Sequence, residues 1–338
     1  MSVEVIALFL AVSLLLYTLL AGADFGAGML ETFSTRDERD EEREIISHAM
    51  GPVWEANHVW LILAVVILFT GFPNAFSALS VTFHIPLTLM LFGIVLRGCS
   101  FTFRHYDAVR DRSHRTYSAL FVISSFLTPL MLGVVAGGAL LGAASPPQAG
   151  FYAAFVRPWA NLFSFSVGVF TCVLFAFLAA VYLLGETSNP AMRRIFVRRA
   201  VIANVLAIAV GITVFVAAQI DGLVLARLFA ASKVSVGSMI GATVMLLPLW
   251  VAIGKNRVQI ARILVAVQVG LVLIGWFRLQ FPVMINSQIQ PLTIYNTAAS
   301  ESTLRYLLYA LVAGSVIIFP ALIYLLKIFK LSEADRLY

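Results

Sequence analysis

The sequence predicts an all-α polytopic membrane protein with nine transmembrane helices. Apolar residues make up 61% of the 338 residues and charged residues only 12%, whereas a soluble domain has roughly 45–50% and about 25%. The apolar residues form long runs, and the Lys and Arg residues lie mainly in the short segments between them. We therefore expect a single integral membrane domain over residues 1–338.

Nine runs of roughly 18 residues or more are long enough to cross a bilayer as helices. Polar residues open the second run, so a hydropathy threshold alone would return eight spans. Pro73 is expected to form a tight turn between the second and third spans. The nine spans lie near residues 3–30, 52–72, 75–98, 117–143, 159–185, 200–220, 234–254, 260–282 and 304–329.

The basic residues orient these spans. With nine spans, 18 of the 23 Lys and Arg residues lie on one side, and the positive-inside rule places that side in the cytoplasm. The N-terminus is then outside and the C-terminus cytoplasmic. Dropping the second span would scatter the asymmetry, which favours nine spans over eight. The 18 residues are Arg36, Arg39, Arg43, Arg97, Arg104, Arg110, Arg112, Arg115, Arg193, Arg194, Arg198, Arg199, Lys255, Arg257, Arg262, Lys327, Lys330 and Arg336.

Composition also excludes several classes of protein. The net charge of +6 does not indicate a nucleic-acid partner, because the basic residues lie in loops between apolar spans. Cys99 and Cys172 form no CxxC pattern, which excludes a disulfide scaffold and a thiolate metal site. The first apolar run follows Glu4 without a basic segment, so we expect it to be a retained span.

The stretch Gly51–Ile62, GPVWEANHVWLI, places polar side chains at the start of the second span. Glu55 and His58 are three residues apart and share a helix face, with Trp54 and Asn57 beside them. Ionisable groups in a membrane helix are costly, face the protein interior and usually mark an ion or proton path. A purely hydrogen-bonding role for His58 and a helix-terminus role for Glu55 stay open.

Asp24 lies near the cytoplasmic end of the first span, at the same predicted depth as Glu55 and His58. The small residues around it allow another helix to approach closely. These three groups are therefore our candidates for a proton path. The alternatives for Asp24 are a cap at the helix end and an ion pair with a loop arginine, such as Arg36 or Arg97.

The histidines do not indicate a metal or haem site in this chain. No two of them have an i, i+4 spacing on one helix. His58 and His84 are expected at opposite depths, and the other three in cytoplasmic loops. We therefore expect no metal ligands in this chain. The five histidines are His48, His58, His84, His105 and His114.

The stretch Gly51–Ile62 resembles the signature of subunit II of the cytochrome bd quinol oxidases. The stretch Asp24–Leu30, DFGAGML, is similar to a second motif of that family. Three weaker matches follow in the right order, and together the matches cover nearly the whole chain. They are Leu96-Arg-Gly with Phe103-Arg104, Ile220-Asp-Gly222, and Phe281-Pro with the stretch Leu292–Leu304.

The resemblance implies two four-helix bundles plus one peripheral helix. It implies a heterodimer with a larger subunit I, which carries haem b and haem d and oxidises quinol while reducing O₂ to water. This chain would ligate no haem and hold no catalytic residue, although some members carry a structural quinone or lipid. Besides subunit I and quinol, the expected partners are membrane lipids, in a bacterial or archaeal cytoplasmic membrane.

Carried over by position, the resemblance assigns the acids of the proton path to Asp24 and Glu55. Many relatives have Asp at the position of Glu55, an amide at that of His58, and a further acid at that of Ala21. The chain thus departs from a two-acid entrance on its first span. The remaining residues expected to line and support the pocket are Trp54, Asn57, Trp60 and Arg97.

Two other functions remain possible from the sequence. One is a proton- or cation-coupled transporter, although such transporters often bind near the midplane and this polar cluster lies near one boundary. The other is a purely structural scaffold for subunit I.

Overall fold

The computed structural model describes the chain with small gaps. It covers residues 2–35, 37–106, 112–143, 145, 148, 150–287 and 290–334. Within these ranges only the backbone is described for Pro52, Glu55 and residues 104–106, 112–115, 323 and 325–334.

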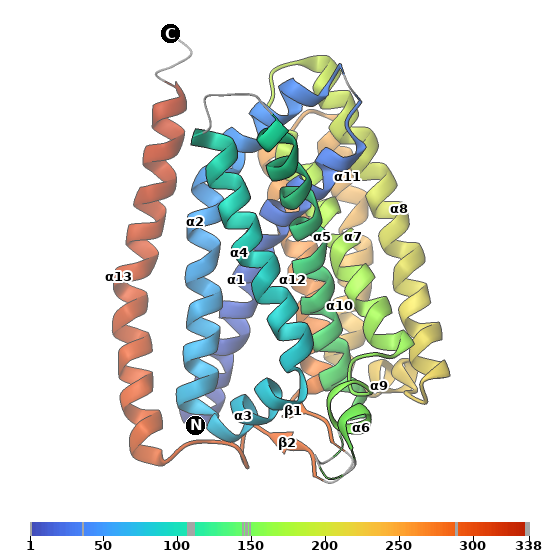
Figure 1. Ribbon diagram of the computed structural model, residues 1–338, viewed down its shortest axis with the longest axis vertical. Helices are drawn as coiled ribbons and strands as arrows, with labels where there is room; N and C mark the ends of the chain where they lie inside the picture. Colours follow the sequence, from blue (N-terminus) through green and yellow to red (C-terminus); the bar gives the residue numbers. More distant parts are fainter. Residues whose placement is uncertain are drawn as a thin grey trace.

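Long helices dominate the described residues (Figure 1). The helices of the candidate membrane spans are α1 (Ser2–Leu30), α2 (Arg39–Gly71), α4 (His84–Tyr106), α5 (Arg112–Leu141), α7 (Leu162–Leu183), α8 (Pro190–Ile220), α10 (Lys233–Val244), α11 (Leu246–Gly254), α12 (Val258–Gln280) and α13 (Glu301–Ala334). The short elements are the 3₁₀ helix Glu31–Phe33, α3 (Pro73–Thr82), α6 (Phe151–Phe155), α9 (Leu225–Ala231), and the strands β1 (Val283–Ile285) and β2 (Leu292–Thr293).

Eight helical segments of the described chain are long and apolar enough to cross a membrane, with α10 and α11 counted together. Helix α2 is a ninth candidate span if its two segments, Arg39–Gly51 and Ala56–Gly71 at 48° to each other, are counted as one. The polar stretch expected to weaken the second span therefore lies at this bend. The predicted fold class, an all-α membrane protein, is confirmed, and the eight to nine candidate spans agree with the nine that the sequence predicts.

The helices form two groups and one outlying helix. Helices α1, α2, α4 and α5 pack together as the first bundle, and α7, α8, α10–α11 and α12 as the second. Helix α13 lies at the edge of the molecule, on α2 and α1 (Figure 1). The bundles meet where α7 packs against α1 and α5.

The contact between α1 and α7 depends on a glycine. A Cβ built on Gly26 would lie 2.1 Å from the backbone oxygen of Phe175 and 2.7 Å from the Cβ of Ala179. Only a residue without a side chain lets the two backbones come this close. The small residues around Asp24 thus join the two bundles.

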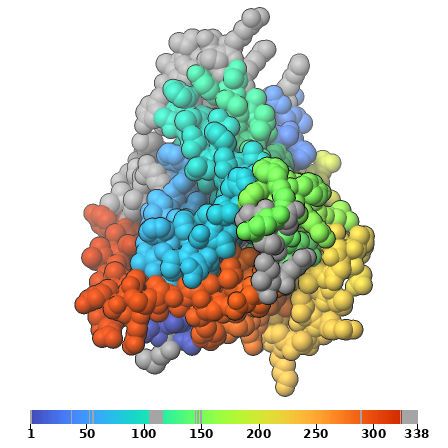
Figure 2. Space-filling view, turned by 60° about the horizontal axis from the view of Figure 1, so that its bottom comes forward, coloured from blue at the N-terminus to red at the C-terminus, as the bar shows by residue number. Residues whose placement is uncertain are grey.

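The segment between α12 and α13 forms a cap over one end of the first bundle. Strands β1 and β2 pair antiparallel, and the amide of Asn286 donates to the oxygen of Ala139 at 2.8 Å. The amide of Ala299 likewise donates to the oxygen of Gly71 at 2.9 Å. Figure 2 shows this face, with the orange cap segment beside the cyan residues of α3 and early α4.

Two expected boundaries differ from the structure. The expected third span, 75–98, is divided at Phe83, and the crossing helix α4 begins at His84 because α3 is a separate short helix after Pro73. His84 thus opens a span instead of lying inside one. The expected loop 31–50 is helical from Arg39 onward, so His48 lies on α2. The acidic residues Asp40, Glu41 and Glu42 in its first turn favour a helix N-terminus.

Candidate functional site

Asp24 and Arg97 form a buried ion pair inside the first bundle. Asp24 is 0% exposed and Arg97 is 1% exposed. The Nη2 atom of Arg97 lies 2.6 Å from Oδ1 of Asp24, and its Nε lies 3.2 Å from Oδ2. Nη2 also donates to the backbone oxygen of Asp24 at 2.6 Å. This two-point contact, which the guanidinium fork favours, joins α1 to α4.

The surroundings of the guanidinium complete its binding site. The rings of Phe25 and Phe121 lie 4.8 Å and 4.3 Å from Cζ of Arg97, within range of a cation–π interaction. Nη1 of Arg97 donates to Oγ of Ser125 on α5. A Cβ on Gly28 would lie 2.2 Å from that Oγ and 2.6 Å from Nη1, so a glycine is needed there. Every part of this cradle is therefore supplied by α1, α4 and α5.

Asn57 connects α2 to the ion pair. Its Nδ2 donates to Oδ2 of Asp24 at 3.2 Å, and the residue is fully buried. Its Oδ1 is buried and has no hydrogen-bond partner among the residues that the structure describes. A buried acceptor of this kind normally binds a water molecule, so Asn57 presents an open polar contact beside the carboxylate.

His58 and Trp54 lie together on the next turn of α2. Nδ1 of His58 lies 2.7 Å from the backbone oxygen of Trp54, and the two rings meet edge to face at 5.8 Å. Trp54 also packs against Gly98 and stands 5.7 Å from the ring of Phe101. In the described part of the chain no hydrogen bond joins His58 to Asp24. The structure thus joins Asn57 and Arg97 to Asp24, and His58 to Trp54.

Two further residues predicted for the site, Trp60 and Glu55, have no described contact with the Asp24–Arg97 pair. Trp60 is buried, with its ring 5.6 Å from that of Phe319 on α13, and its Nε1 has no hydrogen-bond partner in the described part of the chain. The backbone of Glu55 lies in α2 near the bend, and its side chain is outside the described residues. Arg36, the other arginine considered for Asp24, also lies outside them.

Comparison with known proteins assigns the chain to a family. A family model described as cytochrome bd terminal oxidase subunit II matches residues 2–329. The chain belongs to this family. The match extends beyond the two motifs to nearly the whole sequence.

Individual relatives in the bd subunit II family match over shorter stretches. Cytochrome bd-I ubiquinol oxidase subunit 2 of Escherichia coli (strain K12) is 33% identical over 136 residues, which are 40% of this chain and 35% of that protein. Cytochrome bd ubiquinol oxidase subunit 2 of Bacillus subtilis (strain 168) is 32% identical over 120 residues, 34% of this chain and 33% of that protein. These alignments span about a third of each relative's length.

The fold matches a solved member of the bd oxidases. A chain in the structure of bd oxidase from Geobacillus thermodenitrificans superposes with a TM-score of 0.79 and 20% identity. The match covers 97% of this chain and 99% of that chain. At this identity the comparison shows a shared fold.

This bd subunit II chain also contains a buried charge cluster that sequence reasoning missed. Glu42, fully buried on α2, accepts from Ser34 at 2.6 Å and forms an ion pair with Arg199 on α8. Nearby, Glu31 pairs with Arg43 at 2.6 Å. These acids stand among many charges of both signs in the segment 31–50, and nothing in the sequence marks which of them are buried.

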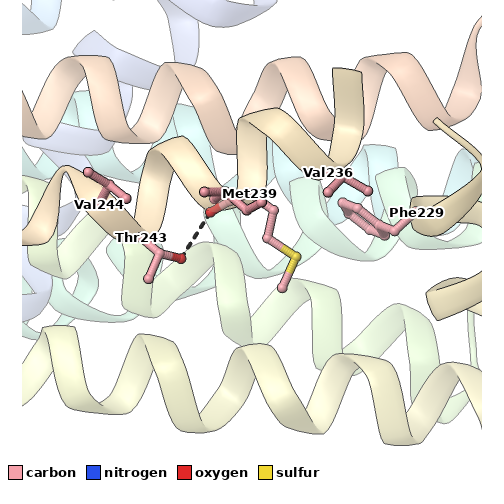
Figure 3. A pocket seen from close by; sticks show the side chains of 6 residues that line it. Phe229, Val236, Met239, Thr243 and Val244 are labelled. Carbon is pink, nitrogen blue, oxygen red and sulfur yellow. Dashed lines mark hydrogen bonds between the residues drawn. The ribbon is translucent and has the colours of Figure 1, made fainter. Parts of the chain in front are cut away.

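A surface cavity lies apart from these charges. It has a volume of about 280 Å³ and is lined by Phe229 of α9 and Val236, Met239, Ile240, Thr243 and Val244 of α10 (Figure 3). The hydroxyl of Thr243 donates to the backbone oxygen of Met239 at 2.9 Å. The side chains that line this cavity carry no titratable group.

Proposed function

We propose that this chain is the non-haem subunit II of a cytochrome bd-type quinol oxidase. In this proposal it assembles with a haem-bearing subunit I, which oxidises quinol and reduces O₂ to water. Haem b and haem d reside in subunit I, and this chain contributes a path for protons from the cytoplasm. Family membership over residues 2–329 carries the proposal.

The placement of the histidines supports the assignment of the haems to the partner. His58 lies thirteen residues before the end of α2 at Gly71, which corresponds to about 20 Å along a helix. His84 begins α4 beyond that same end. One iron cannot be ligated by both residues at this separation.

The proposed proton path uses Glu55, His58 and Asp24, supported by Asn57 and Trp54. Asn57 supports it because it connects the stretch that contains Glu55 and His58 to the Asp24 carboxylate. A carboxylate in a partly dry site can exchange protons near neutral pH. Glu55 is the proposed relay, which exchanges protons. Asp24 is a fixed negative charge beside the path.

A second candidate role is favoured by one observation. The buried ion pair between Asp24 and Arg97 joins α1 to α4, which is what a purely structural scaffold for subunit I would need. On this reading Asp24 maintains the bundle and moves no proton.

The experiment that separates these roles is Glu55→Gln in the assembled oxidase. The glutamine keeps volume and hydrogen bonding but cannot exchange a proton. We expect quinol-driven O₂ consumption per haem to fall about tenfold or more, equivalent to about 1.4 kcal/mol of barrier. Assembly and the haem spectra should stay as in the wild type.

The matched control is Glu44→Gln, an exposed acid on the same helix. It should leave turnover per haem unchanged. Normal turnover in Glu55→Gln, with only the yield of complex reduced, would reject the relay and support the scaffold.

A further inference from the structure

Helices α4 and α5 face each other along a polar seam. Their antiparallel register is set by Arg97, which donates to Ser125, and by Gly93, whose Cβ would lie 2.3 Å from Oγ1 of Thr128. In antiparallel helices, a step forward along one helix corresponds to a step back along the other. The two pairs follow this rule: Gly93 precedes Arg97 on α4, and its partner Thr128 follows Ser125 on α5. This register fixes the height of each residue along the helix axes, which we call its level in the seam.

Hydroxyl side chains follow this seam on both helices. On α5, Ser118 precedes Ser125 by seven residues and Thr128 by ten, and these spacings place the three on one face. On α4, Ser100 follows Arg97 by three residues and shares its face. The order from the predicted cytoplasmic end is Ser118, Ser100, the level of Arg97 and Ser125, and then Thr128.

Three of these hydroxyls have no partner. The Oγ atoms of Ser100 and Ser118 and the Oγ1 of Thr128 are buried and make no hydrogen bond within the described chain. The residues are 1%, 7% and 1% exposed. A hydroxyl on a membrane helix can donate to its own helix backbone, as Ser166 of α7 does at 2.8 Å. The three on the seam do not, so another partner is required.

The levels of the seam lie within reach of bridging water. The helical rise of 1.5 Å per residue places successive levels about 4 to 6 Å apart. One water molecule with two hydrogen bonds spans about 5.5 Å. The spacing of this buried polar row therefore matches the reach of bridging water.

We propose that a file of water molecules occupies the α4–α5 seam from Ser118 to Thr128 and conducts protons past the pair of Asp24 and Arg97. A proton moves along such a file by hopping: each water forms one new O–H bond to the incoming proton and breaks another to release a proton to the next water, so every molecule ends as water again. This inference rests on the proposed function for its direction and adds residues that the sequence did not indicate.

The ion pair has a defined task in this arrangement. An arginine that lines a water file repels protons, as in channels that exclude them. The carboxylate of Asp24 lies 2.6 Å from the guanidinium and cancels this charge. The unpartnered Oδ1 of Asn57 adds one acceptor for water at the same level. Asp24 is thus a positioning residue that keeps the file passable.

The first test is a cryo-electron microscopy map of the assembled oxidase at a resolution that shows ordered water. We expect density within hydrogen-bond distance of the hydroxyls of Ser100, Ser118 and Thr128. A dry seam with well-resolved side chains would overturn the proposal, whatever the complex does with quinol. This readout is therefore independent of the proposed function.

The second test changes the seam. Ser118→Val and Ser100→Val fill the space of the waters with methyl groups. Ser166→Val makes the same replacement at a serine whose hydroxyl already donates within α7. We expect the seam variants to lower O₂ consumption per haem at least fivefold and to raise the solvent deuterium isotope effect. The Ser166 variant should keep the isotope effect of the wild type.

Alanine variants provide the test if a valine variant fails to assemble. Ser118→Ala and Ser100→Ala keep the space and remove one hydroxyl, and we expect a smaller loss of turnover with a raised isotope effect. Unchanged turnover and isotope effect in these variants would overturn the conduction step. Slow seam variants beside a normal Glu55→Gln would reject the relay and leave the water file standing.

Discussion

At the scale of single residues, this chain stabilises one buried cation by several contacts at once. Arg97 binds the carboxylate and backbone of Asp24, the hydroxyl of Ser125 and two aromatic rings. Breaking a buried pair by removing one partner is much more costly than never having the pair, because the remaining charge is left without compensation.

Asp24→Asn is therefore expected to lower the stability of the complex by on the order of 3 kcal/mol, besides slowing turnover. The double variant Asp24→Asn with Arg97→Gln removes both charges and should recover part of the stability. A thermal melt of the purified complex measures both. Additive losses in the double variant would show that the two side chains do not interact.

Gly28 offers a test of the cradle without changing any charge. In Gly28→Ala the new methyl group would overlap Ser125 and Arg97, and overpacking of this kind typically costs about 1–3 kcal/mol. We expect a lower melting temperature for the complex. Gly270→Ala is the matched control, because its new Cβ would make an ordinary van der Waals contact with Leu15, at 3.8 Å.

At the scale of elements, the bend in α2 separates two differently supported segments. The segment Ala56–Gly71 packs in the first bundle, whereas Arg39–Gly51 is tied to α8 by the ion pair of Glu42 with Arg199. The second bundle therefore holds the N-terminal segment of the helix that carries the Gly51–Ile62 stretch.

Glu42→Leu should weaken this connection, because it leaves Arg199 without its buried partner. We expect a reduced yield of assembled complex and faster proteolysis within the segment 31–50. Glu301→Gln is the control, since its pair with Arg305 is exposed and 3.5 Å long, and exposed pairs contribute little. Equal yields for the two variants would show that the Glu42 pair is dispensable.

At the scale of the whole molecule, the direction of the chain in the membrane decides which end of the proposed proton path faces the cytoplasm. The basic residues predict an outside N-terminus and a cytoplasmic C-terminus. A reporter fused after Tyr338 should behave as cytoplasmic, and a tag before Met1 should be accessible from outside. If both termini are found on one side, the number of spans is even and α2 does not cross.

The sequence by itself determined the fold class, the family and the location of the polar stretch. Long apolar runs force helices in a bilayer, because every backbone polar group must be satisfied within its own segment. The same physics makes Asp24, Glu55 and His58 conspicuous, since such groups are rare in apolar runs. Gly26 and Gly28 could be recognised as small residues that permit close helix contact.

Only the tertiary structure decided which charges meet. Arg97 lies 73 residues from Asp24 and was one of two arginines considered for it, and the choice depends on the register of α4 against α1. The pair of Glu42 with Arg199 and the row of unpartnered hydroxyls between α4 and α5 were not predicted. Serines and single charges carry no periodic signal strong enough to show their partners, because hydrogen bonds between helices are set by packing in three dimensions.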